Sequence, residues 1–352
     1  MGDAPLARMF DEEDLAAAVA AGVVPVDVAE AFTGFVATRR GPAARADEEE
    51  VRFVTSFNDI FVTLGIGLVT GAIALLVGRH SIGWAAAGIA VAAWGLAELF
   101  SRRWLMAFPS IVLAGIGVVA SAIAAFGALE PRLAAEGVTM LAGAVVALAV
   151  GFAHWRRVAV PMSVAAATAA AGAAVLALVD LAAPTVMRNH SDAVILPLGL
   201  LAFVLAMWWD ASDRERRTRR TDVAFWLHIL AAPAIVHPLV SAAGIQLGDL
   251  GAGQAAFVVV LFAFLAVVAL VIDRRALLVS GLLYLGVSIA VLLKRSAWNA
   301  MHGEGVTLGI VGAVILLLAI GWRPLRAVAL NLTPARLRAV VPLPAAPRGS
   351  RP

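Results

Sequence analysis

The stretch FNDIFVTLGIGLVTGAIALLVG, residues 57–78, decides the fold class of this chain. Asp59 is its single charged side chain, and about 20 consecutive apolar residues suffice for a helix to cross the hydrocarbon core of a bilayer. The sequence therefore predicts an all-α fold: a polytopic transmembrane helix bundle of about ten spans joined by very short turns. The nine further runs are residues 82–100, 105–128, 137–155, 158–183, 193–209, 223–246, 255–272, 276–293 and 304–321.

Composition supports the same class. Hydrophobic residues make up 62% of the chain and charged residues 14%, whereas a soluble domain has about 45–50% and about 25%. In lipid such an excess is tolerated, because helices satisfy their own backbone polar groups and apolar side chains can face outward. The chain has no cysteine, which excludes disulfides, thiolate catalysis and cysteine metal sites. The net charge is only +3, so we expect no nucleic-acid partner.

The basic residues of the turns predict the orientation. The even-numbered turns between the spans carry eleven arginines, while the odd-numbered turns carry five basic residues. Because basic residues accumulate in cytosolic loops, both termini are predicted to be cytosolic. Tryptophans cluster beside the same predicted interface, where aromatic belts form: Trp104, Trp155, Trp208, Trp209, Trp226 and Trp322.

Three segments are predicted. Residues 1–50 form a cytosolic α-hairpin and an acidic linker, residues 51–322 the ten-span domain, and residues 323–352 a basic, proline-containing cytosolic tail. Helix-start signals recur at Asp11 and at Asp27, each preceded by an apolar residue. The hairpin is either a docking or sensing module or a plain cap on the membrane domain. No signal peptide opens the chain, so the first span is expected to act as an uncleaved anchor.

The seventh span, DVAFWLHILAAPAIVHP at residues 222–238, is the candidate site. Prolines inside a helix free carbonyls that can line a cavity, and histidines can relay protons. The functional hypothesis is that His228, His237, Pro233 and Pro238 line a small cavity, with Trp226 at its cytosolic mouth. The alternative is that both imidazoles bond to neighbouring helices. Nine residues separate the two rings, which places them on opposite faces of a straight helix and argues against a shared metal site.

The C-terminal arginines are the candidates for contact with the lipid surface. Arg323, Arg326, Arg336 and Arg338 lie among leucine and valine, and no acidic residue follows them in the tail. Basic residues beside a span attract anionic lipid headgroups. The sequence contains no phosphate loop, nucleophile elbow or paired carboxylates, so we expect no enzyme, no cofactor and no metal.

A weak repeat runs through the spans. Arginine pairs follow span ends at Arg102-Arg103, Arg156-Arg157 and Arg274-Arg275, and each is followed by a new span that opens with proline or serine. The spacing is about 54 to 60 residues for two spans with their turns. Duplicated helical hairpins would produce this pattern, and so would the charge rule acting on an evenly spaced bundle.

The layout resembles bacterial families known only as predicted membrane proteins with a domain of unknown function. The stretches RFVTSFNDIF, residues 52–61, and FWLHILAAPAIVHP, residues 225–238, carry the resemblance. It implies a bacterial inner (cytoplasmic) membrane location and no functional residues. Two functions remain open: a scaffold, sensor or accessory subunit, or a small-solute or proton-coupled transporter or channel that uses the seventh span. The expected partners are the lipid bilayer and other membrane proteins that bind the N-terminal hairpin.

Overall fold

The structure is a computed structural model, and it describes residues 12–39, 57–130, 136–216, 218–245, 251–294, 299–338 and 340–342. The chain forms two compact units, Met1–Glu48 and Glu49–Pro352. In the first unit α1 (Glu12–Ala20) and α2 (Val26–Arg39) are in contact, as expected for the N-terminal hairpin. Gly22, with φ +69°, and Pro25 lie between them. The predicted acidic linker lies outside the described residues.

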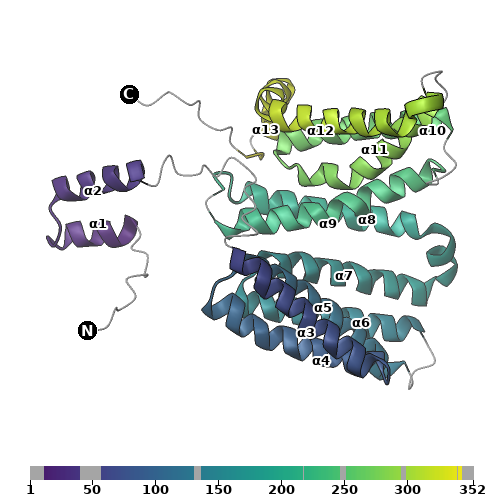
Figure 1. Cartoon of the computed structure of the whole chain (residues 1–352), viewed down its shortest axis with the longest axis horizontal. Coiled ribbons are helices and arrows are strands. Elements are labelled where there is room, and N and C mark those ends of the chain that lie inside the picture. The colour runs from purple at the N-terminus through teal and green to yellow at the C-terminus, as the bar shows by residue number, and fades with distance from the viewer. Residues whose placement is uncertain are drawn as a thin grey trace. The chain divides into compact units, whose positions relative to one another are not determined.

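The second unit is built from helices alone in its described residues, which confirms the all-α class (Figure 1). Nine of these helices are long and apolar enough to cross a membrane. Because α11 is not among the nine, the count of ten spans stays a prediction. The elements are α3 (Phe57–Gly78), α4 (Ile82–Ala97), the π-helical η1 (Glu98–Arg103), α5 (Ala107–Leu129), α6 (Glu136–Val158), α7 (Pro161–Ala182), α8 (Pro184–Ala211), α9 (Arg219–Ala242), α10 (Ala252–Ile272), α11 (Ala276–Lys294), α12 (Asn299–Leu332) and α13 (Ala335–Arg338).

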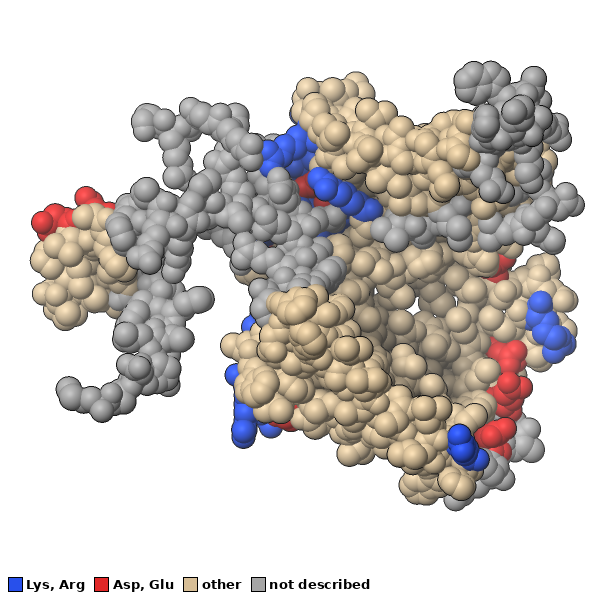
Figure 2. Space-filling view, in the orientation of Figure 1, with Lys and Arg blue, Asp and Glu red and all other residues tan. Residues whose placement is uncertain are grey.

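The surface of this unit fits a bilayer. Figure 2 shows charged side chains gathered at two ends of the helices, with an uncharged surface between them. Large hydrophobic side chains are exposed on the middle of the spans, including Leu75 at 70%, Val204 at 62% and Leu317 at 68%. Water would disfavour so much apolar area, whereas lipid tails accommodate it. The described helices therefore form a multi-pass membrane protein.

Consecutive helices pack as hairpins, and their turns repeat one backbone feature. We call α4–α5, α6–α7, α8–α9 and α10–α11 the four hairpins; the two helices of each lie against each other. Among described non-glycine residues, positive φ occurs at Leu105, Ala159, Arg216 and Asp273, one in each hairpin turn. The intervals are 54, 57 and 57 residues. A charge rule constrains turn composition and not backbone conformation, so this regularity favours duplicated hairpins over an evenly spaced bundle.

The first two hairpin turns also match in detail. Met106 and Val160, which follow the left-handed residues, both adopt φ −79°, with ψ of 122° and 123°. A left-handed non-glycine residue costs about 1–2 kcal/mol, so four recurrences need compensation by the contacts that each turn makes. All four turns lie at one end of the bundle, the predicted cytosolic end, and we call it the turn end.

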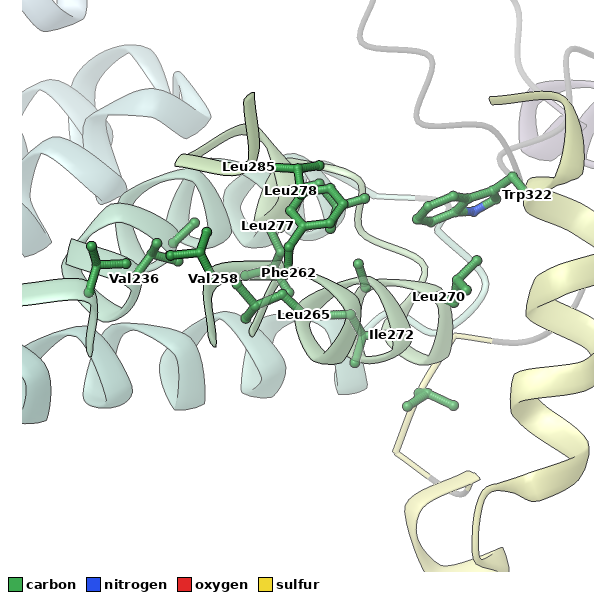
Figure 3. Packing of buried hydrophobic residues seen from close by; sticks show 14 of the residues in the cluster. Val236, Val258, Phe262, Leu265, Leu270, Ile272, Leu277, Leu278, Leu285 and Trp322 are labelled. Carbon is green, nitrogen blue, oxygen red and sulfur yellow. The ribbon is translucent and has the colours of Figure 1, made fainter. Parts of the chain in front are cut away.

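The largest apolar core belongs to the C-terminal half. Side chains of α9, α10, α11 and α12 pack together there, and Figure 3 shows Phe262 beside Val258, Leu277 and Leu278. Trp322 of α12 joins this core at the turn end. Trp322 is 5% exposed, so its burial anchors α12 at the turn end.

Two helix bounds differ from the prediction by nine residues or more. α8 starts at Pro184, before the expected residue 193, and is interrupted at His190, whose φ of −140° and ψ of 33° are non-helical. α12 continues to Leu332, so residues 323–332 of the expected tail belong to the same helix as the last span. Trp322, Arg326 and Leu330 are buried at i, i+4 and i+8. This stripe packs against the bundle, and its packing explains why the helix continues past Gly321.

Candidate functional site

The five seventh-span residues lie on α9, some of them buried and others exposed. His228 is fully buried, while His237 lies on an exposed position, as their spacing predicts. Pro233 is exposed, Pro238 is buried and Trp226 is half-buried. α9 runs unbroken from Arg219 to Ala242 with both prolines inside it. Two cavities in the described bundle are lined by residues of α3 to α6 alone, so none of the five residues contacts them.

Both imidazoles bond to a neighbouring helix. His237 Nδ1 lies 2.9 Å from the Tyr284 hydroxyl of α11. His228 Nε2 lies 3.0 Å from Asp210 Oδ2 of α8, and both of these side chains are fully buried. These contacts match the alternative of the sequence analysis, in which the histidines join helices. His228 also leads to a group of charged residues that the sequence did not bring together.

Asp210 is the centre of this group. Arg274, between α10 and α11, donates from Nε to Asp210 Oδ2 at 3.0 Å and from Nη2 to Asp210 Oδ1. The guanidinium and carboxylate thus form a two-point fork, the strongest geometry for this pair. Arg274 Nη2 also donates to the Thr221 carbonyl at 3.1 Å. The contacts join α8, α9 and the α10–α11 turn within one buried site.

Asp273 forms a second centre beside the first. Arg216 donates from Nη1 to Asp273 Oδ2 and from Nη2 to the Asp273 carbonyl, each at 2.9 Å. Trp322 donates from Nε1 to Asp273 Oδ1 at 2.7 Å, and Arg326 Nε lies 3.6 Å from the same oxygen. Asp273 therefore ties the α8–α9 turn to α12. We call the whole set the ionic cluster: Asp210, Arg216, His228, Asp273, Arg274, Trp322 and Arg326.

Local backbone features put these side chains in place. Arg216 and Asp273 are the left-handed residues of the third and fourth hairpin turns, with φ of 54° and 57°. The turn reversal at Asp273 directs Arg274 back toward α8. On α8 the buried positions Gly199, Ala202 and Ala206 lead to Asp210, so the carboxylate continues the face that packs on α9. A Cβ at Gly199 would lie 2.7 Å from the Ala234 carbonyl carbon, which shows how closely α8 and α9 approach.

The charged side chains of the ionic cluster are almost entirely buried. The side chains of Asp210 and Arg274 are 0% and 2% exposed, and those of Arg216 and Asp273 are 5% and 7% exposed. Burying an ion costs several kcal/mol unless partners and hydrogen bonds compensate it. Here each carboxylate receives donors on both oxygens. This arrangement can hold helix ends in one geometry, but it presents no unoccupied carboxylate oxygen for a solute or metal.

The arginines expected at the lipid surface divide into two groups. Arg323, Arg336 and Arg338 are exposed, and their contact with lipid stays a prediction. Arg326 is 7% exposed and donates from Nη2 to the Pro342 carbonyl at 2.9 Å, so it is not a surface residue. Arg214 holds the same segment, since it donates to the carbonyls of Val341 and Arg338 at 3.0 and 3.2 Å.

The ionic cluster was not predicted, because Arg216 and Arg274 were counted among the arginines of the turns and Asp210 was not paired with them. One signal was visible. The small residues Gly199, Ala202 and Ala206 form a stripe that places Asp210 on the packed face of α8. The pairing with Arg274 spans 64 residues and has no local signature. In the described residues no group of three or more His, Cys, Asp or Glu side chains could hold a metal ion.

Comparison with known proteins adds no family. No family model, no curated protein and no solved structure matches this chain.

Proposed function

We propose that this protein is a non-catalytic integral membrane protein, a scaffold, sensor or accessory subunit, of a bacterial inner membrane. The observation that supports it best is the bonding of both α9 histidines to neighbouring helices, His228 to Asp210 and His237 to Tyr284. A transport path needs polar groups that can exchange partners with a passing solute. On α9 these groups instead join helices.

The ionic cluster supports the same proposal. It connects α8, α9, the α10–α11 turn and α12 at the turn end, and it also holds the segment around Pro342 through Arg326. A framework with fixed helix ends suits a protein that presents surfaces to partners. The α1–α2 hairpin, with exposed Val28 and Phe32, is the surface we propose for binding another membrane protein. Both termini are proposed to be cytosolic, in keeping with the resemblance to bacterial membrane families.

Flux measurements test this proposal against the transporter alternative. The full-length protein is reconstituted in liposomes that contain a pH-sensitive dye, and proton flux is driven by a potassium diffusion potential. Osmotic swelling follows uptake of small neutral solutes. We expect rates equal to those of protein-free liposomes. A flux that His228→Phe or His237→Phe abolishes, while the exposed control His80→Phe retains it, would replace the scaffold by a transporter.

Partner binding is tested separately in native membranes. A photoreactive residue at Phe32 is expected to cross-link one defined membrane protein, and deletion of residues 1–45 to abolish that complex. The deleted protein should keep its thermal transition, because the second unit has its own core. If the complex persists without residues 1–45, the hairpin is not the docking surface.

A further inference from the structure

A cavity lies between α4, α5 and α6, in the half of the bundle that the ionic cluster does not reach. Its volume is about 230 Å³, and its walls include Trp94, Leu113, Gly117, Ser121 and His154. From Leu113 to Ser121 it follows eight residues of α5, or about 12 Å at 1.5 Å per residue. An apolar cavity of about 150 Å³ is large enough to bind benzene, so this one has room for a substituted ring.

His154 gives this cavity a polar end. His154 is only 4% exposed, and its Nδ1 lies 2.7 Å from Ser163 Oγ of α7. The other ring nitrogen, Nε2, is buried and has no hydrogen-bond partner. A buried polar atom left unpaired costs about 1–3 kcal/mol, and such an atom calls for an explanation. Nδ1 is held by α7 and the ring lines the cavity, so a ligand in the cavity can supply the missing partner once the adjoining side chains shift and open Nε2, which has almost no exposed surface.

The hydroxyl of Ser121, which also lines the cavity, already uses its one donor. Ser121 Oγ donates to the Gly117 carbonyl at 2.7 Å, within its own helix. The Trp94 ring meets the His154 ring edge to face at a centroid distance of 5.8 Å and fixes its plane. His154 Nε2 is therefore the buried polar atom of the wall that lacks a partner, and most of the remaining wall is apolar.

The surroundings favour access from the lipid. At the turn end, Glu98 accepts from Arg157 and Arg102, both at 2.8 Å, and thereby joins η1 to α6 beyond His154. On the other side, Val91 is a cavity wall and is 74% exposed on the apolar surface of α4. A ligand dissolved in the bilayer can reach the cavity past Val91.

We propose that this cavity binds a small lipid-soluble phenol or alcohol whose hydroxyl bonds to His154 Nε2. A hydroxyl fits whichever ring nitrogen carries the proton, because it can donate to Nε2 or accept from Nε2–H. A ketone or ether would fit one tautomer only. A charged ligand is excluded, because the apolar walls offer it no counter-ion. This site is independent of the proposed scaffold function.

Photoaffinity labelling tests the site on the full-length protein in lipid nanodiscs. The probe is a 4-alkylphenol with a diazirine in its chain, and its partner is the 4-alkyltoluene in which methyl replaces hydroxyl. We expect the phenol to label peptides containing residues 90–94, 113–121 or 150–154. Loss of one hydrogen bond lowers binding roughly fivefold to tenfold, so the toluene probe and the variant His154→Phe should label these peptides that much less.

Two glycine variants control for folding and for lipid exposure. Gly117→Val fills the cavity but keeps His154, and its Cβ would contact the Ala93 Cβ at an ordinary 3.6 Å. Gly172→Val adds the same bulk on α7, where nothing lies within 4 Å. Labelling should be lost in the first and kept in the second. Equal labelling by the phenol and toluene probes, or undiminished labelling in Gly117→Val, would overturn the site whatever happens in His154→Phe.

Discussion

Replacing Arg274 by methionine should destabilise the membrane unit strongly. The substitution keeps an unbranched side chain out to the position of Nε and removes the guanidinium that contacts both oxygens of Asp210. Asp210 is fully buried, so its charge would remain in the core, where His228 would still bond to it. Breaking one side of a buried ion pair costs about 3–5 kcal/mol. We expect Arg274→Met to lie in that range.

An exposed pair in the same protein provides the control. Arg102 and Glu98 form an ion pair at 2.8 Å, but their side chains are 46% and 31% exposed. Pairs of this kind contribute about 0.2–1 kcal/mol, because water solvates the charges that remain. Arg102→Met should therefore change stability by no more than about 1 kcal/mol, although the bond length is comparable.

Unfolding of the purified protein by SDS in mixed micelles, followed by tryptophan fluorescence, measures these differences. The double variant Asp210→Asn/Arg274→Met removes both charges, and it should recover more than half of the single-variant loss, because replacing a buried pair by neutral groups is often nearly neutral. The reasoning is refuted if Arg274→Met costs less than about 1 kcal/mol, or if the two single losses simply add.

Three further outcomes are expected. Gly199→Ala should cost about 1–3 kcal/mol in the same unfolding assay, because the new Cβ would lie 2.7 Å from the Ala234 backbone. Gly172→Ala, which adds a Cβ in open space, should be neutral, and equal effects of the two variants would contradict the close approach of α8 and α9. His228→Phe should lower the unfolding free energy by about 1–3 kcal/mol more than His237→Phe, since only the first removes a hydrogen bond from a fully buried carboxylate. The reverse order would count against the ionic cluster as a structural unit. Reporter fusions at residues 80, 132, 190, 250 and 298 should all report the periplasm, and a cytosolic result at two or more would reject the orientation.

The repeated turns bear on how the bundle arose. Left-handed residues recur at Leu105, Ala159, Arg216 and Asp273, yet their side chains have no common chemistry. What they share is backbone conformation at one place in each hairpin. In the third and fourth hairpins, this place also became the site of the Arg216–Asp273 ion pair. The Arg216–Asp273 ion pair therefore links equivalent backbone positions of two successive hairpins.

Sequence alone determined the class and the helix positions. Apolar runs such as residues 57–78 became helices at the expected bounds, because a bilayer requires each span to satisfy its own backbone, and that requirement is local. The opposite placement of His228 and His237 was also predictable, because it depends on the turn of one helix. The C-terminal bound was not predicted correctly, because Trp322, Arg326 and Leu330 extend α12 by packing on other helices.

The tertiary structure decided which charges face water and which are buried. Arg102 and Arg274 both follow the end of an apolar run, and composition gives no means to separate them. Arg102 pairs within its own helix and stays exposed, whereas Arg274 reaches Asp210 across 64 residues and is buried. Likewise, the cavity at His154 exists only because α4, α5 and α6 leave space beside that ring. Such contacts depend on how separate helices pack against one another. The residue pattern within a single helix does not encode that packing.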